Sequence, residues 1–600
     1  MPDVGSPLEF SDIVREAAEV NIPRRGGTND RISPGARRTG RSVLWYNLAV
    51  YQCPQTRLHL EVKFMKPLAA IVGISFCTIF GPLPVVAGSE ATSIGKVELA
   101  PNRAIHVNGQ PFFPIMAWLQ DAGNFTAVRD CGMNTTAGYW PGSSDTKDVV
   151  EYQGLVAKAG LYGVMPFAPG LKGHPQLLGY IHDDEPDLPQ QVSDAEVIPA
   201  PHLAINRSTP LWKIVDGVTH TWSVLDPMEG AAITIRLKNK VTVDRLAVWL
   251  TISPGLAVAK EVEFEGDGKP LLKATLESKK GRQELPLPAA ATFRELKLTV
   301  RSAYAGQNEW GSISEIEGFD AAGNNRLLSP PRYEPRSDPK ATLASYRKIK
   351  SADPSRPVFL TLTGNFHPHF GKWSDPQRTT LYPAYIQATD VIGYDIYPIY
   401  GWNKPEWIHL VHDATGLLAE LAGQRPLYAW IETSKGGQWT GALEKQKDVR
   451  PAHIRAEVWM AICRGATAIG YFTHVWKPSY HQFGVPEENR AALREINAQI
   501  TRLAPAILSD EPAPAVTIRG SGDVKLDVLA RRHAGSLYLF AVNYDERAVP
   551  ATATLSVAGL AADTAVEAID EDRVLRCQAG GFEDDFGPLA VHLYRVKKAP

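Results

Sequence analysis

Short apolar runs alternate with amphipathic helical stretches over two parts of the chain, residues 111–189 and 335–505. This alternation predicts repeated strand–helix units around a parallel sheet. The predicted strands are the runs 114–118, 133–139, 161–167, 177–182, 357–364, 390–397, 427–432 and 467–472. Together the two parts approach the roughly 250 residues of a (β/α)8 barrel. We therefore predict one α/β TIM barrel rather than two unrelated α/β domains.

The hydrophobic period changes to two over residues 190–334, where short alternating strands are separated by Gly and Pro. This pattern predicts an antiparallel β-sandwich inserted after the fourth barrel strand. The barrel is then divided into residues 88–189, which include a lead-in, and residues 335–507. Residues 508–600 return to alternating strands and predict a small C-terminal β-sandwich domain.

The N-terminal region predicts export. Residues 65–87 begin with Met65, continue as an apolar run and end in small residues, which is typical of a secretory signal peptide. The preceding residues 1–64 show no sustained period and are interpreted as a non-native or disordered extension from an over-extended start. A signal anchor is the alternative, but Pro82 and Pro84 leave an apolar core shorter than the roughly 20 residues of a spanning helix. The expected location is periplasmic or extracellular.

Composition narrows the function classes. With 44% hydrophobic residues, 21% charged residues and a net charge of -2, the chain has no basic excess that would predict nucleic-acid binding. Its five cysteines are not spaced as a metal knuckle or a redox pair. The 14 Trp and 20 Tyr suit the stacking of sugar rings, although most such rings pack in cores. A carbohydrate partner is thus expected, and the oligomeric state stays open.

Two glutamates carry the predicted chemistry, because Glu185 follows the fourth predicted strand and Glu432 ends the seventh. Carboxyl groups at the C-terminal ends of barrel strands lie at the catalytic face. A pair about 5 to 5.5 Å apart performs retaining glycoside hydrolysis without a cofactor or metal. Asp183 and Asp184 should disfavour ionisation of Glu185, which suits the acid/base, and Glu432 would be the nucleophile.

Other polar and aromatic residues near predicted strand ends are candidates for substrate binding. They are Asp184, Trp118, Tyr139, Asn365, Tyr394, Tyr397, Trp439, His474 and Trp476. Tyr397 or Tyr394 would also hold Glu432 in line through a hydrogen bond. Structural roles are the default for Asp395, Glu457, His367 and His369; the two histidines lack a third metal ligand.

The placement of the two glutamates resembles the clan A retaining glycoside hydrolases, which carry the acid/base on strand four and the nucleophile on strand seven. Residues 393–398 and 455–472 are similar to stretches in barrel enzymes that act on β-galactosides and related glycans. The resemblance implies β-linked substrates. One position departs from it: clan A usually has Asn before the strand-four glutamate, and this chain has Asp184, which would accept rather than donate a hydrogen bond.

The insert resembles the discoidin-type, coagulation factor 5/8 C-domain-like and galactose-binding modules. Residues 214–217 with Thr221 and Trp222 look like their opening motif, and residues 312–319 look like their closing strand. The resemblance implies either glycan binding or a purely structural role, and it allows calcium near Asp216.

These observations predict an exported glycoside hydrolase that cleaves β-linked glycans by double displacement. One alternative is a non-catalytic carbohydrate-binding protein on a barrel scaffold. The other is an inverting glycosidase or a transglycosylase that uses the same carboxyl pair. The sugar, its linkage and exo or endo action stay open.

Overall fold

The computed structural model describes residues 92–142, 146–206, 209–522, 524–578 and 580–597. The predicted signal peptide and N-terminal extension lie outside these ranges. No helix within them has both the length and the apolarity that crossing a membrane requires.

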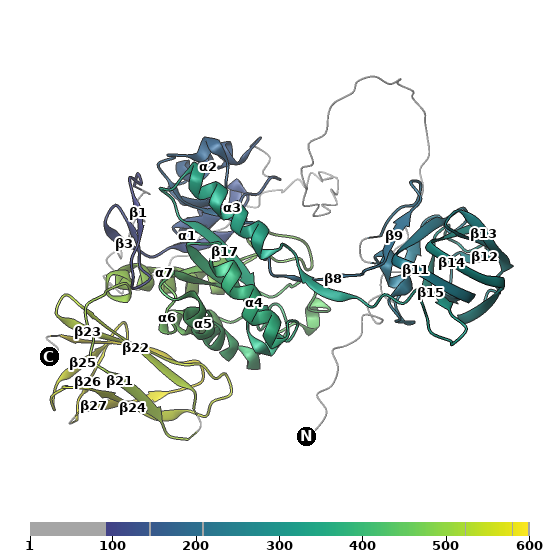
Figure 1. The fold of residues 1–600 in the computed structure, drawn as a ribbon. Helices are drawn as coiled ribbons and strands as arrows, with labels where there is room; N and C mark the ends of the chain where they lie inside the picture. Colours follow the sequence, from purple (N-terminus) through teal and green to yellow (C-terminus); the bar gives the residue numbers. More distant parts are fainter. Residues whose placement is uncertain (1–91, 143–145, 207–208, 523, 579, 598–600) are drawn as a thin grey trace, which may run out of the picture. The chain divides into compact units, whose positions relative to one another are not determined.

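Eight parallel strands form a closed barrel (Figure 1). In chain order they are β4 (Ile115–Trp118), β5 (Thr135–Ala137), β6 (Tyr162–Pro166), β7 (Leu177–Ile181), β17 (Val358–Thr363), β18 (Val391–Asp395), β19 (Leu427–Glu432) and β20 (Ala468–Phe472). The pairing of β20 with β4 closes the ring, and β7 pairs with β17 across the intervening insert. The predicted parallel barrel is confirmed, with a strand at each of the eight predicted runs.

Alternate residues of the barrel strands belong to two different apolar clusters. On β19, Tyr428 and Trp430 pack with residues from the other strands, which makes this cluster the barrel interior. Leu427, Ala429 and Ile431 belong to the cluster that includes the helices. The large rings in the barrel interior leave no space for a side chain at residue 393. A Cβ there would lie 2.2 Å from the Tyr428 ring, so this position is glycine.

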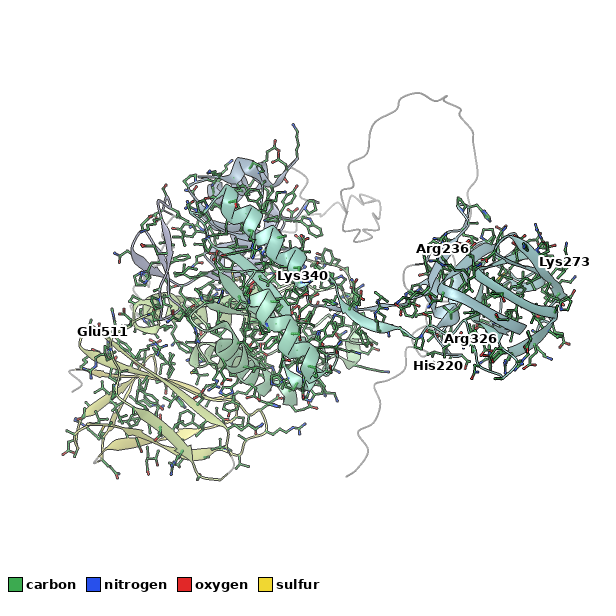
Figure 2. The ribbon with its side chains drawn as sticks, in the orientation of Figure 1. His220, Arg236, Lys273, Arg326, Lys340 and Glu511 are labelled. Carbon is green, nitrogen blue, oxygen red and sulfur yellow. The ribbon has the colours of Figure 1, made fainter. Side chains whose placement is uncertain are left out.

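Helices cover the outside of the barrel and connect its strands. They are α1 (Phe125–Asp130), α2 (Val149–Lys158), α3 (Pro339–Ala352), α4 (Asp375–Ile386), α5 (His409–Ala422), α6 (Pro451–Cys463) and α7 (Glu487–Ile507). Apolar residues of α4, α5 and α6 join the outer cluster, and Trp459 of α6 is fully buried there. Lys340 marks the start of α3 in Figure 2.

Between β7 and β17 the chain forms antiparallel structure. The strands β8 (Pro189–Val192) and β16 (Arg332–Pro335) pair as a two-stranded stem. A seven-stranded antiparallel sheet lies between them in sequence: β9 (Glu196–Pro199), β10 (Ser223–Leu225), β11 (Ala232–Leu250), β12 (Val258–Gly266), β13 (Lys269–Thr275), β14 (Gly281–Tyr304) and β15 (Gly311–Phe319). It has its own core, in which Ile214, Phe264 and Phe293 are buried. Its surface carries cross-strand ion pairs such as Arg236 with Glu295 (Figure 2).

Further strands precede and follow the barrel. A small sheet, β1 (Val97–Leu99), β2 (Ile105–Val107) and β3 (Gln110–Phe112), leads into β4. After α7, one sheet contains β21 (Val516–Gly520), β24 (Ala551–Val557) and β27 (Gly581–Phe586), and a second contains β22 (Leu526–His533), β23 (Ser536–Asn543), β25 (Ala565–Ala568), β26 (Arg573–Arg576) and β28 (Val591–Lys597). Residues of both sheets share one apolar core. On the other side of the second sheet, Phe540 packs against Trp459 of α6.

Candidate active site at the mouth of the barrel

The turn after β7 places Glu185 at the C-terminal face of the barrel. Glu185 has a φ of 47°, a left-handed conformation that is uncommon for a residue other than glycine. The backbone N–H of Leu188 donates to the carbonyl of Glu185 and closes the turn. Backbone strain of this kind costs about 1 to 3 kcal/mol and concentrates at functional sites. The Glu185 side chain stays 22% exposed, so it can meet a ligand.

Asp187 anchors this turn to the next barrel strand. Its carboxylate accepts hydrogen bonds from the backbone N–H of Thr363 at 2.8 Å and from the Thr363 hydroxyl at 2.7 Å. The hydroxyl of Tyr382 on α4 donates a third, at 3.0 Å. Burial raises the pKa of Asp187 to about 7, although these donors favour its ionised form. Since Thr363 ends β17, the bonds tie the Glu185 turn to the fifth strand.

Arg336 contacts the same turn from the chain segment that follows β16. Its Nη1 donates to the carbonyl oxygen of Asp184 at 2.8 Å, and its Nη2 lies 3.3 Å from Oε2 of Glu185. The positive charge of Arg336 lowers the pKa of Asp184, but burial and the negative charge of Glu185 outweigh it. The pKa of Asp184 is therefore well above its usual range.

Asp395, the last residue of β18, lies against Glu185. Burial and the negative charges of Glu185 and Asp184 raise the pKa of Asp395 well above its usual range. Neighbouring negative charges disfavour ionisation of a carboxyl group, so Asp395 stays protonated over a wider pH range. The structure therefore brings three carboxyl groups together from the C-terminal ends of β7 and β18, one of them at a position to which the sequence pattern assigned only a structural role.

Tyr397 is the predicted binding residue that joins this carboxyl cluster. Its pKa is raised by burial and by the negative charges of Asp395, Asp184 and Glu185, so its hydroxyl stays protonated. A protonated phenol beside carboxylates can donate a hydrogen bond to them or to a ligand.

Glu432 occupies a different environment. It is 0% exposed, and its Oε1 and Oε2 accept the backbone N–H of Ile399 at 3.0 and 3.1 Å. Its Oε2 also accepts the N–H of Tyr400 at 2.6 Å. The expected bond from Tyr397 or Tyr394 is thus replaced by two main-chain donors from the loop after β18.

Glu457 of α6 completes this second carboxyl pair. Burial together with the negative charge of Glu432 raises the pKa of Glu457 well above its usual range. Burial also raises the pKa of Glu432, to about 7, against the effect of its backbone donors. Glu457 therefore stays protonated over a wider pH range than an exposed glutamate. No substrate atom can reach Glu432 in this conformation, because the loop after β18 and α6 enclose it.

A band of aromatic rings extends from Tyr397 across the C-terminal ends of the strands. Tyr397 lies 4.9 Å from Phe472, the last residue of β20, and Phe472 stacks on Trp476 at 6.0 Å. Trp476 contacts Tyr480 at 5.3 Å, and Tyr480 contacts Trp140 at 6.3 Å. Rings of this kind present the apolar faces on which sugar C–H groups stack.

His474 fixes the path of the loop that follows β20. Its Nε2 lies 3.0 Å from the carbonyl oxygen of Trp118 and 3.1 Å from that of Leu119. Burial lowers the pKa of His474 to about 4, so the ring is neutral. Nε2 therefore carries the hydrogen and donates, and Nδ1 is free to accept from the Tyr480 hydroxyl at 3.3 Å.

The remaining predicted binding residues are spread over different environments. Tyr394 points away from the mouth, since its hydroxyl bonds to the Val411 carbonyl oxygen and to Thr415 on α5. Trp118 lies in the barrel interior against Trp430. The others lie in half-buried or exposed loops: Tyr139 packs on Tyr152, Asn365 donates to Thr363, and Trp439 is 73% exposed. The residues near the carboxyl cluster and the aromatic band are Asp184, Tyr397, His474 and Trp476.

His367 and His369 cap a loop turn, because the backbone N–H of His369 donates to Nδ1 of His367. Within the ranges that the structure describes, no group of three His, Cys, Asp or Glu side chains is arranged to hold a metal ion.

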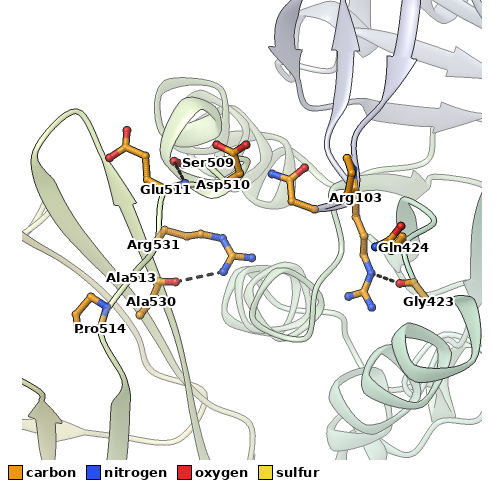
Figure 3. A pocket seen from close by; sticks show the side chains of 12 residues that line it. Arg103, Gly423, Gln424, Ser509, Asp510, Glu511, Ala513, Pro514, Ala530 and Arg531 are labelled. Carbon is orange, nitrogen blue, oxygen red and sulfur yellow. Dashed lines mark hydrogen bonds between the residues drawn. The ribbon is translucent and has the colours of Figure 1, made fainter.

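A separate hollow of about 580 Å³ is lined by residues that include Arg103, Gly423 and Arg531 (Figure 3). Gly423 and Gln424, which line it, precede the N-terminal end of β19. Arg103 spans one wall and donates to the carbonyls of Gly423 and Ala419. Residues at the N-terminal ends of barrel strands serve stability rather than catalysis, so the carboxyl cluster is the candidate active site.

The pattern of residues along the sequence did not indicate that Arg336 and Asp187 belong to the site. Arg336 is 151 positions from Glu185, and the two meet because β8 pairs with β16. Asp187 could have been noticed as a third acid in the turn after strand four, but its partners lie on β17 and α4.

No family model matches the chain, and no curated protein matches it. Several solved structures are similar. The family 32 CBM from C. perfringens NanJ in complex with galactose is 14% identical, with a TM-score of 0.18, covering 21% of this chain and 97% of that one. The CBM32 of AlyQ in complex with 4,5-unsaturated mannuronic acid is 18% identical, with a TM-score of 0.18, covering 21% and 95%.

A third similar structure is the α-amylase from Geobacillus thermoleovorans complexed with acarbose. It is 14% identical, with a TM-score of 0.32, covering 44% of this chain and 58% of that one. TM-scores this low carry no argument about function. The functional assignment of the chain therefore depends on its own carboxyl cluster and aromatic band.

Proposed function

We propose that the protein is a glycoside hydrolase that works at the C-terminal mouth of its barrel. The observation that carries the proposal is the convergence of Asp184, Glu185 and Asp395 beside a hydrogen-bonding phenol, Tyr397. These are the groups that cleave a glycosidic bond without a cofactor. The aromatic band from Phe472 onward supplies a surface on which sugar rings can stack.

Glu185 is assigned as the acid/base. It occupies the position of the strand-four acid/base in the clan A resemblance, it is partly exposed, and its turn is braced from β17 and by Arg336. In the first step its proton passes to the leaving glycosidic oxygen. In the second step it accepts a proton from the water that releases the sugar.

The second carboxyl group has two candidates. The sequence predicts Glu432, but its oxygens are enclosed and accept main-chain hydrogen bonds. Asp395 is half-buried, ends an inward-facing strand and touches Glu185. A nucleophile must reach the anomeric carbon, so we assign Asp395 to this role and retain Glu432 as the alternative. Attack requires the ionised form of Asp395, which its raised pKa disfavours in the free protein.

We propose retention of configuration on the clan A resemblance. Retaining pairs lie about 5 to 5.5 Å apart and inverting pairs about 6.5 to 9.5 Å apart, so the separation of the two carboxyl groups with substrate bound tests this point. Two finer points rest on the sequence alone: β-linked substrates on the clan A resemblance, and export on the predicted signal peptide.

Asp184 takes a different role from the one its charge suggested. Because its pKa is raised, its carboxyl group is protonated over a wider pH range and then has an O–H that can donate. A protonated Asp184 can therefore replace the donor function of the Asn that clan A usually carries there. We propose that it contacts the substituent at the sugar 2-position.

Azide rescue tests the assignment of the two roles. The protein without residues 1–87 is assayed on aryl β-glycosides and on β-glucan, galactan and mannan. Asp395→Gly with azide should yield a glycosyl azide of inverted configuration, and Glu185→Ala one of retained configuration. If Glu432→Gly, rather than Asp395→Gly, gives the inverted product, Glu432 is the nucleophile and the assignment of Asp395 is wrong.

The same panel separates the other classes of function. Binding of glycans without hydrolysis by any preparation would instead identify a non-catalytic carbohydrate-binding protein. Transfer products that dominate at high acceptor concentration would identify a transglycosylase. The glycosidase proposal requires hydrolysis that Glu185→Gln lowers by about 10²-fold or more, which is the typical contribution of a general acid.

A further inference from the structure

The insert leaves and rejoins the barrel through the stem formed by β8 and β16. Pro189 of β8 is the register partner of Pro335 of β16. The turn that contains Glu185 ends directly before Pro189, and Arg336 follows directly after Pro335. The antiparallel pairing therefore brings Arg336 beside the Glu185 turn, although the insert separates them in sequence.

Main-chain hydrogen bonds continue this pairing into the turn itself. The N–H of Arg336 donates to the Leu188 carbonyl oxygen at 2.9 Å, and the N–H of Ser337 donates to that of Pro186 at 2.9 Å. The hydroxyl of Tyr385 on α4 bonds to the carbonyls of both Ser337 and Pro186, at 2.5 and 3.2 Å. The backbone of Arg336 is thus held on one side of the turn, and its guanidinium group is directed at the acids.

The guanidinium group makes two different contacts at once. Nη1 donates to the Asp184 carbonyl oxygen at 2.8 Å, and Nη2 pairs with the Glu185 carboxylate at 3.3 Å. Both charged side chains are about three-quarters buried, with exposures of 24% for Arg336 and 22% for Glu185. The planar guanidinium group of arginine can bind the main-chain carbonyl and the carboxylate at the same time, whereas the ammonium group of lysine is a single point charge.

The charge of Arg336 opposes a concentration of negative charge. The acids around Glu185 are Asp183, Asp184 and Asp187 on its own turn and Asp395 at the end of β18, with the Tyr397 hydroxyl beside them. Arg336 lowers the pKa of Asp184 against this negative charge, so removal of the cation would raise it further.

We propose that Arg336, delivered by the stem of the insert, is a positioning residue that orients Glu185 for proton transfer and offsets the negative charge of the carboxyl cluster. This inference rests on the proposed function. The proposal makes the stem of the insert part of the active site, independently of what the rest of the insert binds.

Three variants test the proposal in the full mature chain. Arg336→Gln removes the charge, Arg336→Lys keeps the charge without the fork, and Arg332→Gln is the matched control. Arg332 lies on β16, is half exposed and pairs with Asp194 and Glu334 away from the acidic turn. The control should behave as the wild type.

Arg336→Gln should lower kcat by about tenfold or more, the typical effect of losing a hydrogen bond to a charged group, with a smaller change in KM. The acid limb of its kcat/KM profile should move to higher pH, because removal of a positive charge favours protonated carboxyl groups. Arg336→Lys should restore the position of the limb but only part of kcat. A purely structural role would lower the amount of folded protein without moving the limb.

A readout independent of activity separates this inference from the glycosidase proposal. Carboxyl carbons of Asp and Glu are labelled with ¹³C, and the Asp184 resonance is identified by its loss in Asp184→Asn. Its titration midpoint should rise in Arg336→Gln and not in Arg332→Gln. A rise in a protein that hydrolyses no glycoside would overturn the glycosidase assignment but support the electrostatic role of Arg336. An unchanged midpoint and an unchanged kcat in Arg336→Gln would overturn the inference about Arg336.

Discussion

The buried pair of Glu432 and Glu457 makes the stability of the barrel depend on pH. Burial raises the pKa of Glu432 from its usual value of 4.5 to about 7. An unfolded chain releases this proton near pH 4.5, whereas the folded protein keeps it until about pH 7. Above pH 4.5 the folded state therefore binds more protons than the unfolded state, and stability falls as the pH rises through 7. The difference corresponds to about 3 kcal/mol.

Glu432→Gln removes this titrating group while preserving its shape. We expect the fall in the free energy of unfolding between pH 5 and pH 8 to be smaller by about 3 kcal/mol in the variant. Urea denaturation followed by tryptophan fluorescence measures it, since Trp430 lies two residues from the substitution. The control is Glu444→Gln, an exposed residue in the segment between β19 and α6.

One result would contradict this reasoning about stability. A variant whose stability retains the pH dependence of the wild type would show that Glu432 does not carry the raised pKa. The same variant also tests the mechanism, since a folded Glu432→Gln protein without any turnover would contradict the assignment of Asp395 as nucleophile.

Two further predictions concern the turn and the aromatic band. Asp187→Ala leaves the N–H and hydroxyl of Thr363 and the hydroxyl of Tyr382 without their acceptor. The folded protein should therefore lose about 3 kcal/mol or more of stability. Thermal unfolding would measure this loss, and a value below about 1 kcal/mol would refute the anchoring role. Trp476→Ala should raise KM by about 3- to 10-fold, the value of one aromatic contact, and should change kcat by no more than about twofold. A loss of kcat with an unchanged KM would exclude a stacking role. Trp439→Ala, at an exposed residue, tests the predicted binding role of Trp439 on the same substrates.

The number and type of the barrel strands could be predicted from sequence because burial imposes a local pattern. A strand covered on both faces reads as a short apolar run, and the helix beside it has a period of 3.6, so each unit is recognisable from some 30 residues. The same reasoning correctly placed Glu432 at the last position of β19.

The direction of a side chain at the end of a strand is decided by its neighbours in space. Alternation with Tyr428 and Trp430 predicts the face on which Glu432 lies, but the main-chain N–H groups of Ile399 and Tyr400 enclose its carboxylate. These donors come from the loop after β18, and no periodicity encodes their approach.

The sequence by itself therefore determined the parallel barrel, the strand ends at which acids occur and the aromatic content of the loops. Only the tertiary structure decided which acids meet. Asp395 lies near Glu185 because β18 and β7 end at the same face of one closed barrel, and Arg336 reaches Glu185 because β16 returns along β8. The physical reason is that burial of each strand and helix leaves a hydrophobic pattern in its own residues. The distance between two charged groups that are far apart in sequence depends instead on how the whole barrel folds.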